Sequence, residues 1–424
     1  MAVKLRSTGC LLGLSLLFCA ATNAQVTFPS TFVGPETSDE LNGPPVLFGQ
    51  SVATDGNIAL VGEPLYGTDP DGFGGQGEIA VYATADNGVT WTRTGRIVDP
   101  NATTGEAMGV TVAFKGKWLI TGSNSAEHVF EKKGAAPNET WIEKSVIPTQ
   151  FNSTSVLSPA AIAFDGELLA VENSSSEVWI YRIGHDGKGQ LLDKLVAPTT
   201  TCSFGTSIAI EGDTVVVGCP QGAGGYPPIT APGLAYVYTR HVGDHWVLEQ
   251  ELDGTASGGD FGYSVAIHRK TVLIGAPYAD TVIGLGGSYV LSGGATYVYR
   301  HERGTWTQTQ ALEPVGLIGE PGYSGFGWSV ALNGEYAVIG APGGSSIAEP
   351  ENDGSSAIYK WSDNQLQFVT QAPGGAGGIS AAISNRTAIL GTVKDLFVFG
   401  DFEYATIIDL AGATSTTRSS EPER

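Results

Sequence analysis

Acidic side chains in glycine-rich stretches are the first residues of this chain whose types and spacing could do chemistry. The stretch GTDPDGFGGQG places Asp69 and Asp71 one residue apart among backbone carbonyls, and Glu349, Glu351 and Asp353 form a similar cluster. Carboxylate and carbonyl oxygens are the ligands that Ca²⁺ prefers. Asp69 and Asp71 are therefore candidate calcium ligands, and the alternative is that both stretches are solvated turns.

The motifs of the commonest enzyme classes are missing from the sequence. It has no Gly-x-Ser-x-Gly, His-Glu-x-x-His or Gly-x-x-x-x-Gly-Lys-Ser/Thr stretch, which argues against the usual hydrolase, metalloprotease and phosphate-loop chemistry. The six histidines are scattered, and we expect the one close pair, His241 and His245, to face water rather than bind a metal. Carboxylates are numerous, so a glycosidase-like pair drawn from separate segments stays open as an alternative. No catalytic residue is assigned, and we expect a binding protein rather than an enzyme.

Aromatic side chains stand in several loops rich in Gly and Asn. Those that we take as candidate ligand-binding residues are Tyr66, Phe73, Tyr226, Tyr278, Tyr289 and Tyr323. Exposed aromatic rings stack on sugars or anchor a protein partner. The alternative for any one of them is packing of its loop onto itself.

These loops belong to a unit that the chain repeats seven times. The copies start at residues 48, 108, 158, 204, 261, 326 and 377, and an exit position follows each start by fourteen residues, occupied by glycine in six copies and by Glu172 in the third. The starts lie 46 to 65 residues apart, which is the spacing of propeller blades or solenoid units.

Side-chain size within the repeat indicates a propeller. The first strand of each copy carries Ala at one fixed position, as at Ala53 and Ala209, with Ser, Thr or Ala two residues earlier. The second strand is a continuous apolar run, and the third is aromatic, as at 236–238. Small residues suit an innermost strand where seven sheets converge. We predict an all-β fold, a seven-bladed β-propeller of four-stranded antiparallel blades over residues 25–410, with a solenoid or a sandwich as the rival.

The repeat resembles the FG-GAP repeat of integrin α-subunit propellers. The best copies are residues 261–277, FGYSVAIHRKTVLIGAP, and the equivalent stretches 204–220 and 326–342. The resemblance implies a ligand face on the rim that carries the second-to-third-strand and fourth-to-first-strand loops. Integrin blades that bind calcium have a long Asp-x-Asp-x-Asp-Gly loop between the first two strands, whereas each copy here has a tight turn such as Asp55-Gly56. The integrin-type calcium loops are therefore absent.

The two ends of the sequence indicate a secreted chain. In residues 1–24, Lys4 and Arg6 precede an apolar run and a small-residue cleavage site, as in a signal peptide. No later stretch approaches the length of a membrane span, so we expect no transmembrane segment. The net charge of −21 becomes more negative by two without the signal, and such a surface repels nucleic acid. Residues 411–424 are expected to be a disordered polar tail.

Cysteines and glycosylation sequons fit the same compartment. The hairpin of the fourth copy should bring Cys202 and Cys219 together, so we expect a disulfide, with two free thiols as the alternative. The candidate N-glycosylation sites are Asn101, Asn138, Asn152, Asn173 and Asn385.

The segment before the first repeat, residues 26–33, reads as a fourth strand without a blade of its own. We expect it to complete blade seven and close the ring by removing open sheet edges. The competing strand is 404–410, and the pattern is compatible with the use of both.

We therefore expect a secreted, extracellular binding module that recognises a glycan or a protein through one rim of the propeller, in an adhesion or recognition role. An extracellular enzyme that acts on polysaccharide with rim carboxylates is one alternative. A structural protein of the matrix or cell wall is another.

Overall fold

The structure is a computed structural model, and it describes residues 25–34, 47–67, 75–103, 105–149, 160–199, 201–221, 233–254, 259–279, 281–282, 290–291, 293–314, 324–343, 356–372, 377–392, 404–412 and 414–416. The regular elements in these residues are all β-strands. Accordingly, they contain no helix that is long and apolar enough to cross a membrane.

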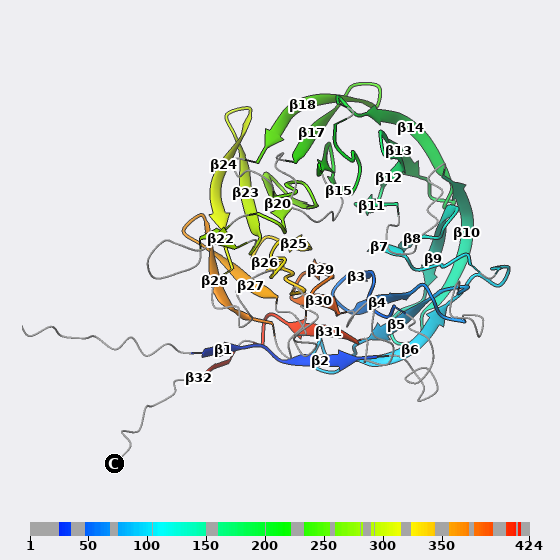
Figure 1. Cartoon of the computed structure of the whole chain (residues 1–424). Coiled ribbons are helices and arrows are strands. Elements are labelled where there is room, and N and C mark those ends of the chain that lie inside the picture. The colour runs from blue at the N-terminus through cyan, green and yellow to red at the C-terminus, as the bar shows by residue number, and fades with distance from the viewer. Residues whose placement is uncertain are drawn as a thin grey trace, which may run out of the picture.

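Seven four-stranded antiparallel sheets surround a common axis (Figure 1), which confirms the predicted seven-bladed β-propeller. Blades one to three contain β3 (Val52–Thr54), β4 (Ile58–Glu63), β5 (Glu78–Ala83) and β6 (Thr92–Ile97); β7 (Thr111–Lys115), β8 (Trp118–Gly122), β9 (Ala126–Lys133) and β10 (Thr140–Pro148); and β11 (Ile162–Phe164), β12 (Leu168–Ser174), β13 (Glu177–Ile183) and β14 (Gly189–Val196). Blades four to six contain β15 (Ser207–Glu211), β16 (Thr214–Cys219), β17 (Leu234–His241) and β18 (His245–Asp253); β19 (Ser264–His268), β20 (Thr271–Ala276), β23 (Ala295–Glu302) and β24 (Thr305–Leu312); and β25 (Val330–Leu332), β26 (Tyr336–Ile339), β27 (Ala357–Ser362) and β28 (Gln365–Gln371). Blade seven contains β29 (Ser380–Ser384), β30 (Thr387–Thr392), β31 (Tyr404–Asp409) and β2 (Ser30–Val33).

The hydrophobic core lies between the blades rather than inside any one of them. Each of the seven clusters of buried apolar residues joins two neighbouring blades. Phe204 and Phe261, from the Phe-Gly pairs, are almost completely buried and pack against third-strand tyrosines such as Tyr236 and Tyr297. A single blade therefore has no core of its own, and its stability depends on its neighbours.

In five of the seven blades, the small residue near the start of the first strand is a serine that also bonds to the next blade. Its hydroxyl donates a hydrogen bond to the carbonyl of the glycine that opens the next blade, as from Ser264 to Gly327 at 2.7 Å. Equivalent bonds of 2.7–2.8 Å start from Ser51, Ser207, Ser329 and Ser380. The glycine at the end of the second strand is required at the same place, because a Cβ on Gly275 would lie 2.0 Å from the Gly327 oxygen.

The ring closes in blade seven, where β2 pairs antiparallel with β31, Ser30 opposite Ile408 and Val33 opposite Ala405. The predicted closure by the N-terminal strand is confirmed, and both competing strands are used, with β31 as the third strand. A second contact supports the same role. Tyrosines of third strands donate to a carbonyl at the end of the previous blade's fourth strand. The acceptors are Asp253, the last residue of β18, Glu313, directly after β24, and, for Tyr82 of blade one, Gly34, directly after β2.

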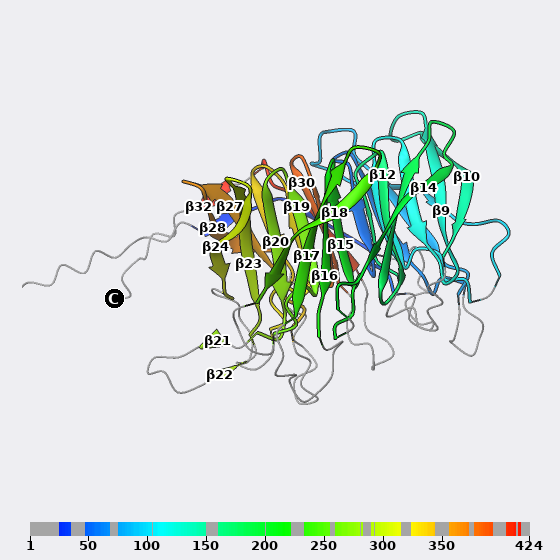
Figure 2. The same cartoon turned by 90° about the horizontal axis from the view of Figure 1, so that it is seen from above.

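Two small sheets lie outside the blades. β1 (Gln25–Thr27) pairs with β32 (Thr414–Thr416), so part of the segment predicted as a disordered tail is paired in a sheet. β21 (Thr281–Val282) and β22 (Val290–Leu291) pair in the connection between β20 and β23 and project beyond the blades in the side view (Figure 2). The connections between first and second strands contain two or three residues in every blade, as predicted.

Candidate functional site

The end of the propeller where first strands begin carries the second-to-third and fourth-to-first connections, and we call this end the loop rim. Two predicted rim residues, Tyr66 and Tyr278, are described by the structure. The others lie outside the described residues, namely Phe73, Tyr226, Tyr289 and Tyr323, the candidate calcium ligands Asp69 and Asp71, and the acidic cluster 349–353.

Tyr66 is held by its own blade. Arg96 of β6 donates a hydrogen bond of 2.6 Å to the Tyr66 hydroxyl, and its guanidinium lies 5.6 Å from the ring centroid. The same guanidinium nitrogen, Nη1, also lies 3.5 Å from Oε2 of the buried carboxylate of Glu78. Tyr66 therefore packs onto blade one, which was the alternative use foreseen for each of these aromatic residues.

Tyr278 belongs to an aromatic cluster between blades five and six. Its ring centroid lies 6.4 Å from those of Tyr263 and Trp328, which are themselves 4.8 Å apart. All three side chains are partly exposed at the loop rim. Burial, together with the nearby charge of Asp260, raises the pKa of the Tyr278 and Tyr263 hydroxyls, so both stay neutral at physiological pH. The cluster therefore offers a neutral, apolar surface with a few polar edges.

Tyr263 and Trp328 are not among the residues predicted from the sequence, although a signal for them exists. Each directly follows the Phe-Gly pair of its repeat, and copies one, two and four have Gln50, Val110 and Thr206 at that place. An aromatic residue at this position is therefore a departure from those copies, and it occurs in the two blades that form the cluster.

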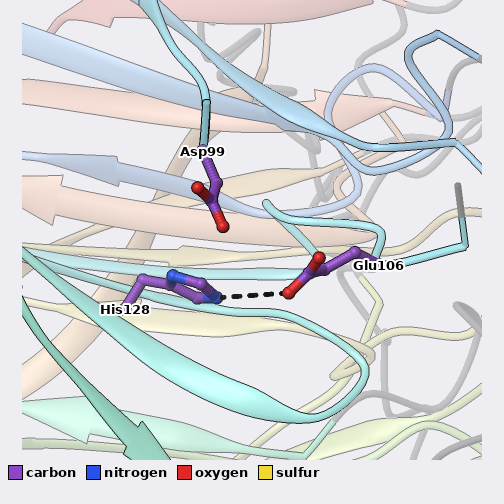
Figure 3. Close-up of side chains that lie close together, drawn as sticks. All are labelled: Asp99, Glu106 and His128. Carbon is purple, nitrogen blue, oxygen red and sulfur yellow. Dashed lines mark ion pairs between the residues drawn. The ribbon is translucent and has the colours of Figure 1, made fainter. Parts of the chain in front are cut away.

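A second group of side chains joins blade one to blade two at the loop rim. Asp99, Glu106 and His128 each have a potential ligand atom, and these three atoms lie within 4.8 Å of one another. Among the described residues, this group could hold a metal ion. Figure 3 shows the carboxylates of Asp99 and Glu106 turned toward the imidazole, with His128 Nε2 4.0 Å from Glu106 Oε1. No sequence motif marks this group, because its members come from the β6–β7 connection and from β9.

His128 is 2% exposed and has fixed neighbours. Its Nδ1 lies 2.9 Å from Glu143 Oε1 on β10, and its Nε2 lies 3.3 Å from Ser123 Oγ. The carboxylates are held by their own connection, since the Asn101 amide donates to Asp99 Oδ1 and the Thr103 amide donates to Glu106 Oε2, at 2.8 and 3.1 Å.

Blade three departs from the regular contacts between blades. In blade two, Thr111 takes the place of the bonding serine, and its buried Oγ1 has no hydrogen-bond partner among the described residues. In blade three that place is Ala161, and the strand-ending glycine is replaced by Glu172, whose Oε2 accepts a bond of 3.2 Å from the Ala161 amide. Burial raises the pKa of Glu172 to about 7, against the weaker opposite effect of that bond. Burial also raises the pKa of Glu127 on β9 well above its usual range.

Some of the cysteines and sequon asparagines are buried and others are exposed. Cys202 and Cys219 form a disulfide with a Cα–Cα distance of 5.2 Å. Asn101, Asn138 and Asn385 are exposed, whereas Asn152 lies outside the described residues. Asn173 requires a correction, because it is 1% exposed in β12 and a glycan there would have to occupy the interior.

His241 and His245 lie directly opposite each other at the end of the β17–β18 hairpin, away from the loop rim. Both are exposed. His245 approaches Asp193 Oδ2 at 3.8 Å, and neither histidine lies in the group around His128.

Comparison with known proteins adds to these observations. Residues 246–299 and 319–359 match the FG-GAP repeat, and they cover much of blades five and six. Integrin alpha-7 of Rattus norvegicus is 30% identical over 150 residues, 35% of this chain. The chain matches that relative over 12% of the relative's length.

Proposed function

We propose that this FG-GAP repeat propeller is a secreted binding module that recognises an extracellular glycan or protein through its loop rim, in an adhesion or recognition role. The observation that carries the proposal is the cluster of Tyr263, Tyr278 and Trp328. Aromatic rings held by one another and partly open to solvent suit stacking on sugar rings or anchoring an apolar side chain. Rigid blades position such loop residues for recognition.

Several features support an extracellular location. The Cys202–Cys219 disulfide is of a kind that persists in oxidising compartments. The exposed sequons at Asn101 and Asn138 and the apolar N-terminal segment agree with secretion. The similarity to an integrin α subunit supports recognition as the role of the propeller.

The test is binding of the purified, secreted chain to an array of glycans and extracellular-matrix proteins, with calcium and again with a chelator. We expect saturable binding that Tyr278→Ala and Trp328→Ala each weaken by about tenfold or more, since buried aromatic anchors contribute more than 1 kcal/mol to binding. Phe368→Ala removes an aromatic ring that is 36% exposed on the outer strand β28 and serves as the matched control.

Unchanged binding in the Tyr278 and Trp328 variants would place the ligand elsewhere, and no binding on any array would contradict the proposed role. Calcium dependence would support Asp69 and Asp71 as proposed calcium ligands.

A further inference from the structure

We propose that Asp99, Glu106 and His128 bind one divalent transition-metal ion, Zn²⁺ or an ion of similar ligand preference, at the junction of blades one and two (Figure 3). This site is separate from the aromatic cluster, and the proposal does not depend on the identity of the ligand bound there.

The contacts of His128 leave one ring nitrogen for a metal. Glu143 Oε1 lies 2.9 Å from Nδ1, and since a carboxylate only accepts, this contact favours the tautomer with its hydrogen on Nδ1 and its lone pair on Nε2. The hydroxyl of Ser123, 3.3 Å from Nε2, is already placed to donate to the Ala126 carbonyl at 3.2 Å. Metal-bound histidines generally have this arrangement, in which the second ring nitrogen donates to a carboxylate.

The two carboxylates are held with one oxygen each toward the imidazole. The amides of Asn101 and Thr103 engage Asp99 Oδ1 and Glu106 Oε2, which leaves Asp99 Oδ2 and Glu106 Oε1 for a cation. Zinc–ligand bonds of about 2.0–2.2 Å place tetrahedral ligands about 3.4 Å apart. The observed 4.0 Å between His128 Nε2 and Glu106 Oε1 therefore closes with a side-chain shift of less than about an ångström.

Charge favours a cation at this place. Three carboxylates, from Asp99, Glu106 and Glu143, surround one imidazole, and the ion pairs among the described residues bring no lysine or arginine to any of them. One imidazole nitrogen with two carboxylate oxygens suits Zn²⁺ or Mn²⁺, whereas Ca²⁺ takes six to eight oxygens. Water would complete the coordination, because Glu106 is 20% exposed at its side chain.

The experiment uses the full chain after removal of metal with a chelator, and it titrates Zn²⁺, Mn²⁺ and Ca²⁺ by calorimetry and Co²⁺ by visible absorption. We expect one Zn²⁺ per chain, weaker binding of Ca²⁺, and visible Co²⁺ bands that report nitrogen and oxygen ligands. Asp99→Asn and Glu106→Gln should each weaken Zn²⁺ binding at least tenfold. Glu302→Gln, which changes an exposed carboxylate on blade five, is the matched control.

Glu143→Gln tests the orienting role separately. It keeps all three ligands, so the Co²⁺ bands should persist while the affinity falls about tenfold. Folding of each variant is checked by circular dichroism. Zn²⁺ binding that is equal in the wild type and the Asp99→Asn, Glu106→Gln double variant would overturn the proposal. The absence of saturable binding in the folded wild type would also overturn it, and would leave a hydrogen-bonded histidine and carboxylate cluster only.

Discussion

Glu172 carries a prediction that can be worked through in numbers. Burial of this carboxyl between blades three and four raises its pKa from 4.5 to about 7. A shift of this size corresponds to about 3 kcal/mol, at about 1.4 kcal/mol per pKa unit. Between about pH 4.5 and 7 the folded chain holds a proton that the unfolded chain has lost, so stability falls as the pH rises through this window. Above it the folded state bears the full cost of a buried carboxylate.

Glu172→Gln should remove that cost and keep the acceptor for the Ala161 amide. At pH 8 the variant should be more stable than the wild type by about 3 kcal/mol. With an unfolding entropy of about 2.1 cal/mol/K per residue, this gain corresponds to a rise in Tm of about 4 °C for a chain of this size. At pH 4 the two proteins should have the same Tm.

The assay is thermal unfolding from pH 4 to 8 for the wild type, Glu172→Gln and the exposed control Glu302→Gln. Burial also raises the pKa of Glu127, so Glu172→Gln should reduce the pH dependence of the Tm without abolishing it. A pH profile of Glu172→Gln equal to that of the wild type would refute the reasoning. A variant that is less stable at pH 8 would show instead that the ionised carboxylate stabilises the fold.

Two further predictions concern the Cys202–Cys219 disulfide and the ring-closing strand β2. Replacing Cys202 and Cys219 together by Ser should lower the free energy of unfolding by about 3 kcal/mol, because the disulfide closes a loop with a sequence separation of 17. Denaturant unfolding measures this difference. Equal stability of the wild type with and without reductant would argue against the bridge. Deletion of residues 25–34 should lower the free energy of unfolding by at least about 3 kcal/mol, because it removes the buried side chains of Phe28 and Val33. An unchanged Tm of the deletion variant would contradict the role of β2.

The fold could be predicted because its determinants are local. The size of a side chain such as Ser264 and the requirement for glycine at Gly275 repeat at the same positions in copy after copy, and each follows from the close approach of the next blade. The ring-closing strand could be predicted because residues 26–33 resemble a fourth strand without a blade.

The candidate sites could be predicted only in part. Tyr278 was identified from its loop, but its contacts with Tyr263 and Trp328 arise from the packing of two blades. Asp99, Glu106 and His128 have no fixed spacing, because the β6–β7 connection and β9 meet only in the folded chain. A sequon such as that at Asn173 is a local pattern, whereas burial depends on the whole fold.

The ring-closing contact also bears on how the chain is made. β2 leaves the ribosome before every other blade strand, and its partner β31 follows only after all of the others. In the interval Phe28, which is buried in the finished ring, lacks the residues of blades six and seven that cover it, and Val33 lacks Ala405 and Ile407. At high concentration β2 of one molecule can pair with β31 of another, which would give a domain-swapped dimer with every blade complete. The yield of monomer therefore depends on whether β2 pairs with β31 of its own chain before it pairs with β31 of another chain.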